Sequence, residues 1–116
     1  DYADAPTWLS LGEIALEPKM SATEAAGKVL NYMALGLPIV AFDLAVMREY
    51  LGEYGVYAPL GDADAFAEQI LALLNDSARA RAIGNALRAR AIERFSWERA
   101  GREIERVYAR LVNHSR

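Results

Sequence analysis

Residues 20–43 decide the fold of this chain, and they read MSATEAAGKVLNYMALGLPIVAFD. The stretch begins with a polar loop and continues as a helix that Gly36 ends, because glycine readily adopts the left-handed backbone of a helix C-terminus. The run 38–42 is unbroken and apolar with β-branched residues, which is typical of a strand covered on both faces. The stretch therefore predicts a loop, a helix and a buried strand, in that order.

The same alternation continues on either side of this stretch. Short strands that alternate with helices predict an α/β fold with about three parallel strands, helices on both faces and further helices at the C-terminus. Asp62 and Ser96 are of the residue types that cap helices, and we expect them to do so. We expect strands at 13–17, 38–42 and 55–59, and helices at 7–11, 28–35, 46–51, 62–74, 77–94 and 97–111.

The length of 116 residues predicts one domain over residues 1–116. A parallel sheet of three strands is small, and its first strand has no partner on its outer side. Two interpretations follow. Either the chain is part of a larger doubly wound domain, which an initial Asp1 in place of Met also favours, or it forms a homodimer through this exposed strand edge.

Composition excludes several classes of function. The sequence contains no cysteine, so disulfides and cysteine-based metal or redox sites are excluded. No apolar run approaches the roughly 20 residues that cross a bilayer, and no charged start followed by an apolar run indicates a secretory signal. The sequence also shows no spacing typical of metal ligands. We therefore expect a cytoplasmic protein without a metal site.

Charge is divided unevenly along the chain. Residues 1–76 carry three basic and twelve acidic side chains, whereas residues 77–116 carry ten arginines and four glutamates. We expect the arginine-rich part to be a solvated helix face, with no nucleic-acid partner. The alternative is peripheral contact with the anionic inner face of a membrane.

The start of the helix after the polar loop is a candidate anion site. Backbone amides of Gly27, Lys28 and Val29 would face outward there, and the helix dipole favours a phosphate at that end. The alternative is structural: Lys28 would form an exposed (i, i+4) ion pair with Glu24. In the same loop, Ser21 would brace the backbone through its hydroxyl.

Two further expectations concern the rest of the chain. Asp43 follows the buried strand, and we expect it to cap the next helix. Apolar residues recur along one face of the last helix, and we expect this stripe to pack in the core or against another domain. The stripe consists of Trp97, Ala100, Ile104, Val107, Tyr108 and Leu111.

At this point the sequence resembles a known family. Residues 33–41 (MALGLPIVA), the Gly27–Lys28 helix start and residues 95–98 (FSWE) are similar to the C-terminal half of the donor domain of GT-B glycosyltransferases, in the group called glycosyltransferase family 4. The resemblance implies a Rossmann-like half domain from a retaining enzyme. The substrate would be a nucleoside diphosphate sugar, with uridine or guanosine as the nucleoside, and no further cofactor or metal would be needed.

The resemblance also implies roles for individual residues. The family has two glutamates separated by seven residues, and alignment on residues 33–41 places them at Thr23 and Asn31. The first position approaches the donor sugar, so Thr23 and its neighbour Glu24 are the catalytic candidates. The second binds the ribose, a role that the Asn31 amide can take. Ser21, Gly27, Lys28 and Val29 complete the implied donor site.

The same resemblance implies a missing partner domain. The family's upstream βα units and acceptor domain have no counterpart here, so we expect the chain to bind donor without catalysing transfer by itself. The alternative function is a non-catalytic α/β half domain that self-associates.

Overall fold

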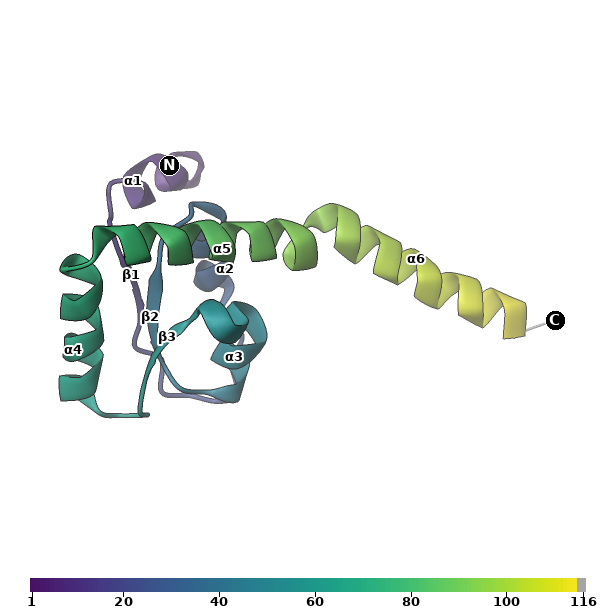
Figure 1. Cartoon of the computed structure of the whole chain (residues 1–116). Helices are drawn as coiled ribbons and strands as arrows, with labels where there is room; N and C mark the ends of the chain where they lie inside the picture. The colour runs from purple at the N-terminus through teal and green to yellow at the C-terminus, as the bar shows by residue number, and fades with distance from the viewer. Residues whose placement is uncertain (115–116) are drawn as a thin grey trace.

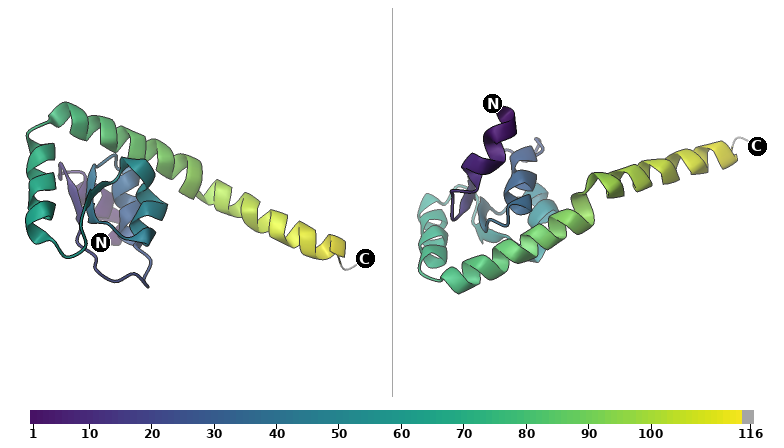
Figure 2. Two further views of the ribbon diagram at one scale, coloured as in Figure 1. Left: turned by 60° about the horizontal axis from the view of Figure 1, so that its bottom comes forward. Right: turned by 90° about the horizontal axis from the view of Figure 1, so that it is seen from above.

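The computed structural model describes residues 1–114 of the chain. A compact α/β body carries a single projecting helix, as Figures 1 and 2 show from three directions. The N-terminal part holds the short 3-10 helix Tyr2–Asp4 and all three strands, and the C-terminal part is helical. The elements in chain order are α1 (Ala5–Leu9), β1 (Ala15–Glu17), α2 (Gly27–Ala34), β2 (Ile39–Phe42), α3 (Ala45–Leu51), the 3-10 turn Gly52–Tyr54, β3 (Val56–Ala58), α4 (Ala63–Leu74), α5 (Ser77–Phe95) and α6 (Trp97–His114).

The three strands form one parallel sheet in the order β1-β2-β3. Ala15 pairs with Ile39, and Val40 pairs with Val56, so the carboxyl ends of all three strands lie at one edge. The central strand β2 is fully buried, as its apolar sequence predicts. The expected α/β fold with about three parallel strands is therefore confirmed.

Helices cover both faces of this sheet. Alternate residues of β2 point to opposite faces because the side-chain period of a strand is two. Ile39 and Ala41 pack in the cluster that includes residues of α2, α3 and α5, whereas Val40 and Phe42 pack with α4. The ring of Phe42 lies 4.9 Å from that of Phe66 on α4, between ring centroids. The larger core lies under α2, α3 and α5.

Glycines allow two parts of this core to approach closely. Gly36 has a φ of +72°, which places the end of α2 in the left-handed region. Gly84 on α5 lies against this turn, and a Cβ built on Gly84 would overlap the carbonyl group of Gly36. The long helix α5 therefore packs backbone to backbone on the turn that leads into β2.

Most expected elements are present, and some bounds differ. The first helix covers Ala5–Leu9 in place of 7–11, because Pro6 lies in its first turn, where a missing N–H costs nothing. The first strand covers only Ala15–Glu17 in place of 13–17. Asp62 and Ser96 cap helices as expected, since each side chain accepts a hydrogen bond from a backbone N–H three residues later.

The final helix is where the expectation of core packing is wrong. In Figures 1 and 2, α6 extends away from the body. The side chains of Trp97 and Tyr108 are 90% and 66% exposed, and the rest of the apolar stripe is exposed or, at Ala100, partly buried. The stripe therefore does not belong to the core of this chain, and packing against another domain stays a prediction.

Candidate functional site

The candidate site lies beyond the carboxyl end of β1. This is the sheet edge at which ligands of open α/β sheets bind. The strand ends at Glu17, an exposed loop follows, and α2 begins at Gly27, on the sheet face that also holds α5. Thus a strand end, a loop and a helix start meet at one place.

The start of α2 has no side-chain cap. Its N-cap residue is Ala26, which has no oxygen to offer, and its first-turn amides depend on other acceptors. The N–H of Val29 donates to the carbonyl of Ala26 at 2.9 Å. Within residues 1–114 the amides of Gly27 and Lys28 make no hydrogen bond to other protein groups. Two exposed donors at a positive dipole end are therefore available to an anion.

Lys28 forms an ion pair that the sequence analysis did not predict. Its Nζ lies 3.4 Å from Oε2 of Glu17, and the Glu17 side chain is only 3% exposed whereas that of Lys28 is 55% exposed. The expected pair with Glu24 is not formed, because Glu24 pairs with Lys19 at 3.2 Å. The Lys28 ammonium therefore lies near the helix start in contact with the buried carboxylate of Glu17.

The exposed loop holds its own hydrogen bonds. The hydroxyl oxygens of Ser21 and Thr23 lie 3.1 Å apart, and the Thr23 N–H donates to Ser21 Oγ at 3.4 Å. The expected bracing role of Ser21 is confirmed. Thr23 and Glu24 are exposed on this loop, where the Thr23 hydroxyl contacts Ser21 and the Glu24 carboxylate pairs with Lys19.

A groove of about 880 Å³ joins the helix start to the α5–α6 junction. Lys28 and Asn31 are one helical turn apart and both line it. Val29 faces the core and is fully buried, so it offers no side chain to a ligand. The other lining residues are mainly apolar: Tyr2, Gly27, Leu30, Ala34, Ala91, Ile92, Phe95, Ser96, Trp97 and Ala100.

A second polar cluster lies at the same sheet edge, after β2. Asp43 does not cap α3 as expected, since the N-cap is Leu44. Its carboxylate instead accepts two hydrogen bonds from Arg48, at 2.8 and 2.7 Å, and the guanidinium lies 3.8 Å from the ring centroid of Tyr57. The hydrogen bonds from Arg48 lower the pKa of Asp43, and burial raises the pKa of Tyr57.

The structure thus brings together three of the predicted site residues. Gly27, Lys28 and Asn31 share one groove, whereas the expected loop residues form a separate exposed group. Sequence reasoning missed Glu17 as a site residue. The available signal was an acid at the end of a short strand, two positions after the buried Ala15 and therefore on the same face.

Two classes of site are not found in the described part of the chain. No group of three or more His, Cys, Asp or Glu side chains is placed to hold a metal ion among the described residues. Among the same residues, no helix combines the length and apolar character needed to cross a membrane.

Comparisons with known proteins identify relatives of this chain. The phosphatidyl-myo-inositol mannosyltransferase of Mycobacterium leprae is 43% identical over 89 residues, which cover 73% of this chain and 23% of that protein. The protein of the same name from Mycolicibacterium smegmatis is 35% identical over 93% of this chain and 28% of its own length. The O-antigen chain mannosyltransferase B of Escherichia coli is 30% identical over 72% of this chain and 22% of its own length.

A solved structure shares the fold. The sucrose-phosphate synthase of Thermosynechococcus elongatus aligns with a TM-score of 0.82 and 26% identity, over 92% of this chain and 27% of that protein. This chain therefore spans about a quarter of the length of its relatives. Residues 1–76, which include Glu17, Lys28 and Asn31, match the family described as Glycosyl transferases group 1. The chain belongs to this glycosyltransferase family, and its Rossmann-like fold is that of a GT-B C-terminal domain.

Proposed function

We propose that this chain supplies part of the donor-binding site of a retaining glycosyltransferase, which transfers a sugar from a nucleoside diphosphate to an acceptor. One observation carries the proposal. The uncapped start of α2 offers the amides of Gly27 and Lys28 and the Lys28 ammonium at the ligand edge of the sheet. Membership of the family supports it, whereas the alternative of a non-catalytic self-associating module is not favoured.

Each residue of the helix start has a distinct role in this proposal. The amides of Gly27 and Lys28 bind the diphosphate, and the Lys28 ammonium offsets the charge that grows on the leaving group. Val29 contributes less than the sequence suggested, because its N–H already donates to Ala26. Asn31 follows one turn later in the same groove, where its amide reaches a ribose hydroxyl.

The loop residues complete the donor site. Thr23 and Glu24 face the donor sugar as the catalytic candidates, and Ser21 holds Thr23 in place. The donor needs no protein-bound cofactor in this scheme. Three relatives are named as mannosyltransferases, so GDP-mannose is the first donor to test.

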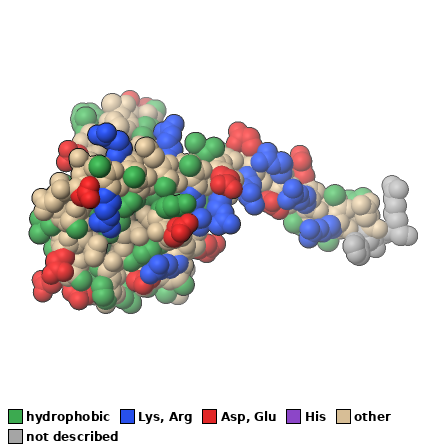
Figure 3. All heavy atoms as spheres, in the orientation of Figure 1, with side chains coloured by type: hydrophobic (Ala, Val, Ile, Leu, Met, Phe, Trp, Pro, Cys, Tyr) green, Lys and Arg blue, Asp and Glu red, His purple; other side chains and the backbone are tan. Residues whose placement is uncertain are grey.

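The proposal also assigns a location and partners. An upstream domain of the whole protein supplies the acceptor site in this proposal, so this chain alone binds donor without transferring sugar. We expect the protein to be cytoplasmic, with peripheral contact with the inner membrane face as the alternative to a solvated arginine-rich helix face. Figure 3 shows arginines of α6 interspersed with acidic side chains on the face in view, which favours the solvated helix face. Co-sedimentation with anionic vesicles tests this contact.

Titration of the isotope-labelled chain with GDP, UDP and GDP-mannose tests the donor site. We expect the amide resonances of Gly27 and Lys28 to shift most, with a smaller shift at Asn31. Lys28→Met removes the cation and should weaken diphosphate binding by about tenfold, because hydrogen bonds to charged groups contribute about 1.5–3 kcal/mol.

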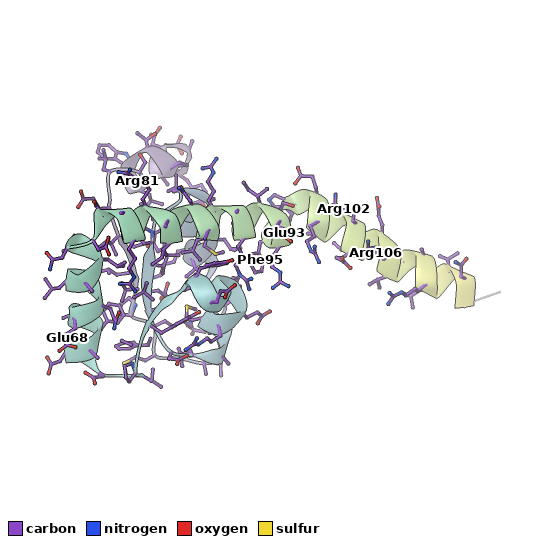
Figure 4. All side chains as sticks on the ribbon, viewed as in Figure 1. Glu68, Arg81, Glu93, Phe95, Arg102 and Arg106 are labelled. Carbon is purple, nitrogen blue, oxygen red and sulfur yellow. The ribbon has the colours of Figure 1, made fainter. Side chains whose placement is uncertain are left out.

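Arg81→Met is the matched control, since it also removes one exposed cation. Arg81 lies on α5 near its junction with α4, and it lines a hollow with Glu13 and Pro38 at the amino end of the strands. Figure 4 shows its position. This variant should bind as the unaltered chain does. Absence of any response between residues 19 and 31 at millimolar ligand would show that the chain has no donor site.

A further inference from the structure

Glu17 is a buried acid that the proposed donor site does not yet use. Its side chain lies on the same sheet face as Ala15, toward α2, and the residue is 2% exposed. Its Oε2 makes no hydrogen bond within residues 1–114, although Lys28 Nζ lies 3.4 Å away. A buried carboxylate oxygen without a hydrogen bond is unfavourable, which indicates a role other than packing.

We propose that Glu17 is the internal counter-ion of Lys28 and competes with the donor's diphosphate for the Lys28 ammonium. The inference rests on the proposed donor site. In the empty site Lys28 is held by Glu17, and in the occupied site it turns to the diphosphate. Glu17 thereby limits how tightly the product nucleoside diphosphate is held after transfer.

The exposure of the two side chains decides which of them moves. Glu17 lies at the end of a strand under α2, so its carboxylate cannot leave for water without disturbing the core. Lys28 has a flexible four-carbon stem, and more than half of its side chain is exposed. Its ammonium has three N–H donors, of which the exposed ones are free to meet a phosphate. Only Lys28 can therefore change partner.

Electrostatics decide the sign of the effect. A phosphate bound to the amides of Gly27 and Lys28 is a second anion at the same helix start. Two anions that share one cation repel each other, and this repulsion is stronger when one of them is buried, because the local dielectric constant is low. Glu17 also orders Lys28 before binding, which reduces the entropy cost of binding, and we expect the repulsion to outweigh this reduction. Glu17 should therefore weaken anion binding.

The test measures the affinity for inorganic pyrophosphate and for GDP by the amide shifts of Gly27 and Lys28. Glu17→Gln keeps the size of the side chain and removes its charge, so it should tighten binding by about five- to tenfold. If the effect acts through the ammonium, the same change in a Lys28→Met background should alter affinity by less than about twofold. Weaker binding by Glu17→Gln, or an equal effect in both backgrounds, would overturn the proposal.

Two further variants serve as controls for this test. Glu13→Gln makes the same charge change before the amino end of β1, at the opposite end of the strand from the candidate site. It should leave the affinity unchanged. Glu17→Met is the second variant at the site, because an apolar residue of similar volume often replaces a buried ion-pair partner without loss of folding. It should tighten binding as Glu17→Gln does.

The outcomes separate this inference from the donor site itself. If pyrophosphate and GDP shift neither amide in the unaltered chain, in Glu17→Gln or in Glu17→Met at millimolar concentration, the donor site is wrong. If both ligands bind and Lys28→Met weakens them, but neither Glu17 variant tightens them, the donor site stands and the counter-ion role is wrong.

Discussion

At the scale of single residues, Gly84 is required by its surroundings and not by its own backbone conformation. Alanine is the better helix former in general, by about 1 kcal/mol. Here, however, α5 lies on the Gly36 turn so closely that a methyl group has no room. Either α5 or the turn would have to move, and both are held by the core.

Gly84→Ala should therefore lower the free energy of unfolding by about 1–3 kcal/mol, the usual cost of overpacking. Urea unfolding followed by circular dichroism measures it. Gly101→Ala is the matched control on α6, where a new Cβ meets no atom within 4 Å. That change should be neutral or slightly stabilising. Equal stability of the two variants would contradict the close approach.

Asp43 and Arg48 predict a pH dependence. The hydrogen bonds from Arg48 hold the pKa of Asp43 below its ordinary value of about 3.9. A lowered pKa in the folded state means that this group stabilises the fold above the ordinary value, and that this stabilisation is lost as the pH falls through the folded-state pKa. Below about pH 4 the stabilisation that Asp43 provides should therefore be lost, and the free energy of unfolding should decrease.

Arg48→Gln tests this dependence by removing the donor of the charged hydrogen bonds. The pKa of Asp43, followed by its carboxyl carbon resonance, should rise toward the ordinary value, and the acid sensitivity of stability between about pH 4 and 2 should decrease. An Asp43 resonance that titrates identically in both proteins would disprove the contribution of Arg48.

At the scale of elements, the N-cap of α5 should contribute measurably to the free energy of unfolding. Asp76 accepts a hydrogen bond from the N–H of Arg79 at 2.9 Å. Asp76→Ala removes this acceptor and should lower the free energy of unfolding by about 1 kcal/mol. Asp76→Asn keeps a capping oxygen and should restore most of the loss. If the asparagine variant is as unstable as the alanine variant, charge and not capping explains the effect.

The elements that the sequence predicts well are those with a local cause. The helix α4 has a capping residue and an apolar face, α5 has a capping residue, and β2 has an unbroken apolar run. Their bounds agree with the prediction to within one residue. The short strand β1 is less well predicted, because its length depends on how far β2 extends beside it.

Pairs of side chains from different elements account for most of what the sequence could not predict. Two acids precede Lys28 in the chain, and helical spacing favours Glu24 over Glu17 as its ion-pair partner. The fold reverses this choice, since the strand end lies beneath the helix start and Glu24 is drawn to Lys19. Asp43 has the residue type of a cap, but the bidentate pair with Arg48 holds its side chain elsewhere.

At the scale of the whole molecule, the outer edge of β1 has no strand partner among the described residues, and the apolar stripe of α6 is exposed. The molecule measures 60 × 30 × 28 Å, and the projecting α6 accounts for its long axis. Every described side chain of α6 other than Ala100 is exposed. Both surfaces are thus candidates for contact with another domain or another copy of the chain.

The alternative interpretation, a homodimer through the β1 edge, is tested by light scattering on the full chain and on a chain that ends at Ser96. Pairing through β1 should give the same concentration-dependent dimer in both, because α6 takes no part in it. Loss of the dimer in the shorter chain would assign association to the stripe of α6. A clean monomer of the full chain at high concentration would disprove self-association.

The strands follow one another in the sheet in the same order as in the chain, and this order has a consequence for how the molecule folds. Each strand pairs with the strand synthesised immediately before it, so no strand waits for a distant partner. Because the entropy cost of closing a loop rises with its length, pairing between successive strands costs less than pairing between distant ones, and we expect the sheet to grow stepwise from β1 to β3 during translation. The last step is the arrival of α5, whose Gly84 closes on the turn before β2. The element that completes the core is therefore the last one of the body to leave the ribosome.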